Sequence, residues 1–218
     1  LIKSIKRKTV DIQHQFIKLL KIIDDYRPNF VINCIALTGL LYCEDKSKFA
    51  FEINSFYPAM LVNSLKKKKI KFIHFSTEAV FKGKTKGKVY SESDNPLPNT
   101  IYGKSKLLAD LSIKNFSNTL IIRLPLLYGP FHKNQIVHKL MTCLKNNKKI
   151  FVSSDVYSTP LYSPLVSKFI INKVLNDELF FNKKLIHFTS DRYLSMYNFI
   201  LLLAKKFGKE TLVEKVKD

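Results

Sequence analysis

The sequence predicts an α/β protein with a parallel β-sheet covered by helices on both faces, followed by a small mixed α/β lobe. Three observations support this prediction. Segments whose apolar residues recur with helical spacing alternate with short, uncharged apolar segments typical of buried strands. The chain has 218 residues, 46% of them hydrophobic, which is enough for one large core and a smaller second one. After residue 130 the regular alternation weakens.

The first part of the chain contains three helix–strand pairs. We expect helices at 13–26, 45–65 and 102–115, buried strands at 30–35, 71–76 and 119–124, and a loop at 82–99. This order favours right-handed crossovers between parallel strands. Later segments predict helices at 134–146, 164–176 and 195–207 and strands at 150–153 and 184–188. We therefore expect domains at 1–130 and 131–218, with segments around 150–175 packing back on the first.

The formal net charge of +20 suggests a nucleic-acid or anionic-membrane partner. However, only Arg7, Arg27, Arg123 and Arg192 are arginines, and the lysines are scattered along the chain. Arginine is the usual residue for bidentate phosphate and base recognition. No apolar run approaches the ~20 residues that span a bilayer, and no secretory pattern is seen. We therefore expect a cytoplasmic protein with no nucleic-acid or membrane partner, whose basic surface attracts an anionic substrate.

Metal and disulfide chemistry are not expected. Cys34, Cys43 and Cys143 lack metal-ligand or paired spacing and lie in or beside apolar stretches, which favours buried, reduced thiols. The five histidines also lack metal-ligand spacing, and we expect them at the surface.

Polar side chains are expected at the carboxyl ends of the parallel strands, where ligands bind in such sheets. Ser76 and Thr77 end the second strand, and Tyr102 and Lys106 lie one turn apart on one helix face. A nearby ammonium lowers the pKa of a phenol and makes it a usable acid, while a Thr77 or Ser76 hydroxyl holds a carbonyl oxygen. A tyrosine four residues before a lysine is common by chance. The alternative interpretation is that Tyr102 and Lys106 are simply two exposed residues on the surface of a helix. Its position after a strand that ends in Ser-Thr favours a carbonyl/alcohol redox site.

The same segments resemble a known family. Residues 27–38 resemble the RPDVVINAAAYT segment, and residues 76–83 the STDYVFDG segment, of dTDP-4-dehydrorhamnose reductases, in the extended short-chain dehydrogenase/reductase superfamily. Residues 90–107, 123–129 and 155–160 continue this resemblance in order, and it extends from about residue 11 to 207.

The resemblance implies a Rossmann-type reductase that uses NADPH or NADH on a nucleotide-linked 4-keto-6-deoxy sugar in surface polysaccharide synthesis, with a homodimer as one candidate assembly. It implies that Thr77 polarises the keto oxygen, Tyr102 donates the proton, and Lys106 lowers the tyrosine pKa and binds the nicotinamide ribose. The implied cofactor-binding residues are Asp11, Ile12, Asn33, Cys34, Ile35, Ala36, Ser76, Lys106, Leu124 and Pro125. Two of these residues have a structural alternative to cofactor binding. Asn33 would form hydrogen bonds with backbone groups between strands, and Pro125 would shape a loop.

Two departures from the family pattern stand out. Glu78-Ala79 replaces Asp-Tyr, which puts the sugar-side contacts in doubt. The glycines at positions 39, 83, 87, 103, 129 and 208 form no Gly-x-x-Gly-x-x-Gly turn to hold a pyrophosphate at a helix N-terminus. Because the chain also starts with Leu1, we expect it to be truncated, to lack the first βαβ part of the fold and to bind its cofactor poorly or not at all.

Two alternatives remain open at this stage. One is an epimerase or dehydratase on the same scaffold, in which the cofactor is recycled. The other is a non-catalytic subunit like the regulatory subunit of methionine adenosyltransferase, which residues 123–129 (RLPLLYG) resemble. Thr77, Tyr102 and Lys106 disfavour the second alternative. The sequence leaves open the sugar, the nucleotide, the choice between NADH and NADPH, and the oligomeric state.

Overall fold

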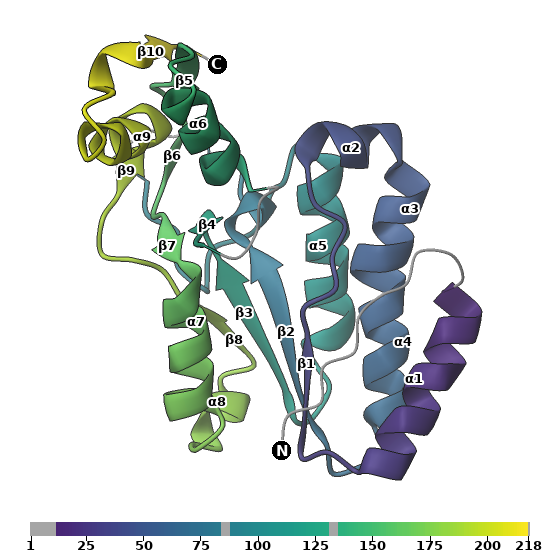
Figure 1. Cartoon of the computed structure of the whole chain (residues 1–218). Coiled ribbons are helices and arrows are strands. Elements are labelled where there is room, and N and C mark those ends of the chain that lie inside the picture. The colour runs from purple at the N-terminus through teal and green to yellow at the C-terminus, as the bar shows by residue number, and fades with distance from the viewer. Residues whose placement is uncertain (1–11, 84–87, 131–134, 218) are drawn as a thin grey trace.

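The structure, a computed structural model, describes residues 12–83, 88–130 and 135–217. Its centre is a parallel sheet formed by β1 (Phe30–Asn33), β2 (Lys71–Thr77), β3 (Thr119–Leu124) and β8 (Leu185–His187), in the order β1-β2-β3-β8 (Figure 1). Every residue of β3 is buried, as expected for the centre of a sheet covered on both faces. The predicted α/β class and parallel sheet are confirmed.

One face of the sheet is covered by α1 (Ile12–Tyr26), α4 (Tyr57–Leu65) and α5 (Ile101–Ile113) (Figure 1). Their apolar side chains form one core with β2 and β3, which includes Phe16, Leu61, Phe72 and Ile113. The short helices α2 (Leu40–Asp45) and α3 (Ser47–Phe51) lie beside the N-terminal end of α5 and cover a smaller core around Cys43 and Ile53.

The opposite face is covered by α7 (Ser163–Phe169), a π-helical turn at Ile170–Val174 and α8 (Leu179–Asn182). A second core joins these helices to Ile73, Leu120 and Ile122 of the sheet. The sheet is therefore the middle of three layers, and residues far apart in the sequence build its two sides.

A smaller lobe lies beyond the carboxyl ends of the strands (Figure 1). It contains α6 (Ile136–Lys145), β5 (Ile150–Ser153), α9 (Met196–Lys205), a 3₁₀ turn at Glu210–Leu212 and β10 (Val213–Val216), with β10 parallel to β5. Two short ladders connect the lobe to the sheet. One pairs β4 (Leu127–Tyr128) with β7 (Leu161–Tyr162), and the other pairs β6 (Tyr157–Ser158) with β9 (Leu194–Ser195).

The structure corrects two of the predicted elements. The helix predicted at 45–65 is α2, α3, a π-helical turn at Glu52–Phe56 and α4. Pro58 causes the π turn, because its nitrogen carries no hydrogen and cannot bond the carbonyl four residues earlier. The strand predicted at 184–188 in the second lobe is β8, which pairs with β3 in the main sheet. The fully buried β3 needs a hydrogen-bonded neighbour on its second edge, and β8 provides one.

Candidate active site

The candidate site lies where the parallel strands end. Thr77 is the last residue of β2 and is paired in register with Leu124, the last residue of β3. Asn33 ends β1 beside β2, and Thr77 leads into a 3₁₀ turn, η2 (Glu78–Val80). The strand ends therefore gather at the edge of the sheet where ligands bind in folds of this kind.

Three contacts fix the start of α5, which carries the predicted tyrosine and lysine. The Thr100 hydroxyl caps the helix by accepting a hydrogen bond from Gly103 N at 3.1 Å, and Glu44 accepts one from Ile101 N at 2.8 Å. Gly103 lies so close to η2 that an added Cβ would be 2.2 Å from the carbonyl oxygen of Ala79. Glycine at this position therefore allows the helix to approach the end of β2, which brings Tyr102 to Thr77.

The Thr77 side chain lies next to the Tyr102 phenol and lowers its pKa. Thr77 Oγ1 also accepts a hydrogen bond from Ala79 N at 3.2 Å, which orients the hydroxyl. We predicted a lowered pKa for Tyr102, but in this structure the pKa is raised. Burial of the phenol is the largest cause, and it outweighs the effect of the Thr77 side chain, which favours the phenolate.

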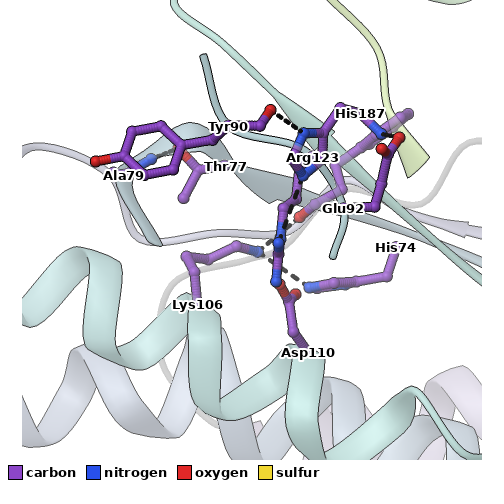
Figure 2. Close-up of polar contacts among 10 residues, drawn as sticks. His74, Thr77, Ala79, Tyr90, Glu92, Lys106, Asp110, Arg123 and His187 are labelled. Carbon is purple, nitrogen blue, oxygen red and sulfur yellow. Dashed lines mark hydrogen bonds and ion pairs between the residues drawn. The ribbon is translucent and has the colours of Figure 1, made fainter. Parts of the chain in front are cut away.

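Lys106 is buried under the site. Its Nζ donates a hydrogen bond to the carbonyl oxygen of Phe75 at 2.7 Å and lies 3.1 Å from Nε2 of His74 (Figure 2). Burial lowers the pKa of Lys106 to about 8, although nearby Asp110 acts in the opposite direction. The lysine is therefore closer to neutrality than an exposed lysine.

A buried ion pair lies behind the lysine. Arg123 Nε is 3.0 Å from Oδ2 of Asp110, one turn after Lys106 in α5, as Figure 2 shows. Burial raises the pKa of the Asp110 carboxyl, while Arg123, the Ser76 hydroxyl and Lys106 lower it. Ser76, predicted to bind the cofactor, is a buried residue that faces this carboxylate.

Further contacts connect the Asp110–Arg123 ion pair to the loop that precedes α5. Arg123 Nη1 is 3.4 Å from Nε2 of His187. The His187 backbone N–H donates to Glu92 at 2.7 Å, and its ring Nδ1 lies 3.2 Å from the carbonyl oxygen of Tyr90. The Tyr90 ring stacks on Phe81 with the ring centres 4.3 Å apart. These contacts hold the loop segment 90–92 against the ends of β3 and β8.

Glu78 connects the sheet to the second lobe. Its Oε1 accepts hydrogen bonds from Leu126 N at 3.1 Å and from the Ser158 hydroxyl at 2.7 Å. Burial raises the pKa of this carboxyl, and the two hydrogen bonds lower it. In this structure Glu78 therefore connects the end of β2 to the segment before β4 and to β6 through hydrogen bonds.

The other predicted cofactor-binding residues lie in different environments. Asn33 is buried and satisfies a backbone group, because its Oδ1 accepts a hydrogen bond from Ile35 N at 3.1 Å. Leu124 and Pro125 are buried beside Thr77, and Ile35 and Ala36 are half-buried. The expectation that all three thiols are buried is confirmed only for Cys43. Cys143 is half-buried, and Cys34 is exposed because it follows the edge strand β1. Asp11 lies outside the described residues, and so does the side chain of Ile12, the first residue of α1.

His74, Asp110 and Arg123 are buried together around Lys106, and their sequence positions did not predict this group. We expected surface histidines, but His74 is fully buried because it lies in the middle of β2 between β1 and β3. A signal was present for Asp110, since it repeats the spacing from Tyr102 to Lys106 on the same helix face.

Residues 12–83, 88–130 and 135–217 contain neither a cluster of metal ligands nor a membrane-spanning helix. No group of three or more His, Cys, Asp or Glu side chains in these ranges could hold a metal ion. Within the same ranges, no helix has the length and apolar character needed to cross a membrane.

The class of the protein follows from this arrangement. A parallel sheet between two helical layers, with polar side chains gathered at its carboxyl edge, defines a Rossmann-type α/β protein. The family model described as the RmlD substrate binding domain matches residues 2–218, and the chain therefore belongs to that family.

The chain is similar to several named proteins. It is 36% identical over 113 residues to a probable low-salt glycan biosynthesis reductase of Haloferax volcanii, a match that covers 51% of this chain and 37% of that protein. It is 27% identical over 202 residues to a dTDP-4-dehydrorhamnose reductase of Aggregatibacter actinomycetemcomitans, covering 91% of this chain and 68% of that protein. The match to a spore coat polysaccharide biosynthesis protein of Bacillus subtilis, 29% identical, covers 88% of this chain and 65% of that protein. The chain thus covers less than two thirds of two of these relatives.

A solved structure supports the fold. The crystal structure of dTDP-4-dehydrorhamnose reductase from Bacillus anthracis, determined in complex with NADP, matches with a TM-score of 0.84 and 24% identity. The match covers 96% of this chain and 72% of that one.

Proposed function

We propose that this chain carries the catalytic residues of an NADPH- or NADH-dependent reductase. Its substrate would be the 4-keto group of a nucleotide-linked 4-keto-6-deoxy sugar, in surface polysaccharide synthesis. The observation that carries this proposal is that Thr77, at the carboxyl end of β2, lies next to Tyr102 at the start of α5, with Lys106 one turn later. The names of the relatives, which include sugar-nucleotide and glycan reductases, support the class of substrate.

The residues at the strand ends fit the nicotinamide half of such a cofactor. Leu124 and Pro125 supply an apolar wall next to Thr77, and the Lys106 amine supplies a donor for a ribose hydroxyl. The glycines of the chain form no pyrophosphate-binding turn, so the fit concerns the nicotinamide end alone. A bound NAD(P)H would supply the hydride that reduces C4.

The side chains of this chain account for the proton. Thr77 Oγ1 accepts from Ala79 N, so its own hydroxyl hydrogen can bond the substrate carbonyl oxygen and orient it toward Tyr102. As the C4–H bond forms and the C=O π bond breaks, the Tyr102 phenol transfers its proton to the oxygen. The product is an alcohol, and the tyrosinate that remains regains a proton from solvent.

The division of labour follows the fold. We propose that residues 1–130 bind the cofactor and residues 131–218 bind the nucleotide sugar, with segments around 150–175 packed against the first part. The lobe at the carboxyl ends of the strands is suitably placed for this role (Figure 1). We also propose a cytoplasmic location and a homodimer.

A Tyr102→Phe variant tests the proposed acid. We expect turnover with a dTDP-linked 4-keto-6-deoxy sugar, followed by NADPH absorbance, to fall by about 10²-fold or more, the scale of losing a general acid. The matched control is Tyr26→Phe at the last residue of α1, before the amino end of β1 and so at the opposite end of the sheet, which should leave turnover unchanged.

Three outcomes would contradict the proposal. Turnover of the Tyr102→Phe variant close to that of the unmodified protein would exclude Tyr102 as the acid. Product formation without net NADPH oxidation would indicate an epimerase instead. An unmodified protein that fails to oxidise NADPH and binds a partner tightly would indicate a regulatory subunit.

A further inference from the structure

His187, the last residue of β8, connects the main sheet to the loop that precedes α5. Its backbone N–H donates to Glu92 at 2.7 Å, its ring Nδ1 lies 3.2 Å from the carbonyl oxygen of Tyr90, and its Nε2 lies 3.4 Å from Arg123 Nη1. Figure 2 shows the histidine among these three residues. The side chain is half-buried, so its ring contacts are partly shielded from water.

The two ring contacts determine which nitrogen of His187 carries hydrogen. A backbone carbonyl oxygen can only accept, so Nδ1, which faces the Tyr90 oxygen, must donate. A guanidinium can only donate, so Nε2, which faces Arg123, must accept. The neutral ring with hydrogen on Nδ1 satisfies both partners. The other neutral tautomer makes neither bond, and the charged ring places an N–H against the guanidinium.

The residues around His187 also pack against the turn that Thr77 leads into. The Tyr90 ring stacks on Phe81 with the ring centres 4.3 Å apart, and the His187 ring meets Phe81 edge to face at 5.7 Å. The Arg123 guanidinium carbon lies 5.3 Å from the centre of the same phenyl ring. Phe81 directly follows η2, which begins after Thr77. The contacts of His187 therefore support the turn that orients the proposed substrate-binding hydroxyl.

The loop held by His187 leads directly into α5, which carries Tyr102. Pro98 packs against the first turn of this helix, since a Cβ added to Gly103 would lie 2.8 Å from the Pro98 Cβ. Thr100 then caps the helix through its hydroxyl. A shift of the loop therefore reaches the start of α5 through a short stretch of chain.

We propose that His187 is a positioning residue whose neutral ring, with hydrogen on Nδ1, holds residues 90–92 against the sheet and so fixes the positions of Thr77 and Tyr102. Protonation of the ring replaces the hydrogen bond from Arg123 with two donors that face each other, which loosens the loop. The catalytic consequence rests on the reductase function proposed above. Turnover should fall at acid pH, because Tyr102 is then less well placed for the substrate oxygen.

The charged groups around the ring agree with the neutral form. Burial lowers the pKa of His187, and the Arg123 guanidinium of β3 acts in the same direction. Glu92 of the loop, the Tyr90 carbonyl oxygen and Asp110 of α5 raise this pKa, but the net shift is downward. Because the pKa in the folded protein lies below the ordinary value of 6.5, the stability that the neutral ring contributes is complete above pH 6.5. It is lost as the pH falls through the folded-state pKa.

The structural part of the proposal is tested by ¹⁵N NMR of the His187 ring in the intact protein at pH 7.5, with His187→Asn used to assign the signals. We expect hydrogen on Nδ1 and an unprotonated Nε2. Hydrogen on Nε2, or a charged ring at this pH, would overturn the proposal. This measurement needs no substrate, and so it separates the inference from the proposed function.

The loosening of the loop is followed in the backbone amide signals of residues 90–92 as the pH is lowered. In the unmodified protein these signals should change together with protonation of the His187 ring. In His187→Asn they should not, because asparagine can donate to the Tyr90 oxygen but does not titrate. Signals that stay constant while the ring is protonated, or a ring that stays neutral until the protein unfolds, would contradict the proposal.

The catalytic part is tested by the pH profile of kcat for NADPH oxidation with a dTDP-linked 4-keto-6-deoxy sugar. We expect kcat of the unmodified protein to fall roughly threefold or more when the His187 ring is mostly protonated, because a small displacement of a catalytic group is costly. This decline should be absent from His187→Asn, whereas His138→Asn, the same change in α6, should keep the unmodified profile. Glu78 is present in all three proteins, so its own titration does not affect the comparison.

The outcomes separate the inference from the function on which it rests. An acid decline that persists unchanged in an active His187→Asn protein would contradict the positioning role and leave the reductase proposal intact. The expected ring tautomer and loop signals in a protein without reductase activity would contradict the proposed function alone.

Discussion

At the residue scale, the buried charges of this fold depend on one another. Asp110 and Arg123 are almost fully buried, at side-chain exposures of 2% and 6%, and their ion pair lies directly behind Lys106. Removing one member of such a pair leaves an uncompensated charge in a medium of low dielectric constant. Replacing only one of the two residues should therefore destabilise the protein more than replacing both with apolar residues.

This gives a prediction for Arg123→Met. We expect it to lower the free energy of unfolding by about 3–5 kcal/mol, because Asp110 remains buried without its partner. The double change Asp110→Leu with Arg123→Met should restore a large part of that loss. Urea unfolding at pH 7 measures both. Lys149→Met, which breaks the exposed pair of Lys149 with Glu214, is the control and should have little effect. An Arg123→Met protein as stable as this control would refute the prediction.

At the element scale, α5 carries the proposed chemistry and Gly103 sets its position. An added Cβ would lie 2.2 Å from the Ala79 carbonyl oxygen and 2.8 Å from the Pro98 Cβ. The first contact is with backbone that cannot move without shifting η2, the turn that follows Thr77. The helix and the strand end therefore lie at a distance that only glycine allows.

Gly103→Ala should accordingly destabilise the protein, although alanine is favoured over glycine by roughly 1 kcal/mol in an unobstructed helix. We expect a loss of about 1–3 kcal/mol, the range for overpacking a tight contact, with reduced turnover because Tyr102 moves away from Thr77. Lys104→Ala, at the exposed neighbouring position, is the control. A stabilised and fully active Gly103→Ala protein would contradict this prediction, because it would show that η2 can shift to accommodate the methyl group without loss of stability.

The same scale shows what the sequence can and cannot predict. The order of helices and strands in the main sheet could be predicted because each element carries its own periodicity. Pro58 was visible, but its effect, a π turn inside a longer helix, depends on α4 continuing after it. The place of β8 beside β3 could not be predicted, since pairing across the sheet leaves no local pattern. Tyr102 and Lys106 could be singled out because they lie four residues apart on one helix. The burial of His74 next to Lys106 could not be predicted, because it depends on strands that meet only in the fold.

At the scale of the whole molecule, Glu78 connects the sheet to the lobe beyond it. Its carboxylate accepts hydrogen bonds from the segment before β4 and from β6, and β6 pairs with β9 at the base of α9. A single acceptor thus joins segments 48 and 80 residues away in the chain. Burial raises the pKa of this carboxyl above its ordinary value, because removing the charged carboxylate from water is unfavourable.

The sign of the pH dependence follows from that shift. With a pKa higher in the folded than in the unfolded state, Glu78 binds more proton when folded, so its contribution to stability declines as pH rises through the folded-state pKa. Glu78→Gln keeps an oxygen that accepts both hydrogen bonds and removes the titration. We expect its stability, relative to the unmodified protein, to increase from pH 4 to pH 7 in urea unfolding experiments. Glu78→Ala should instead lose about 1–3 kcal/mol, because the buried Ser158 hydroxyl is left without its acceptor. Glu210→Gln, the same change at an exposed position, should show no such trend. If Glu78→Gln is instead destabilised progressively as pH rises, then the charge of Glu78 itself, and not its two hydrogen bonds, joins the lobe to the sheet.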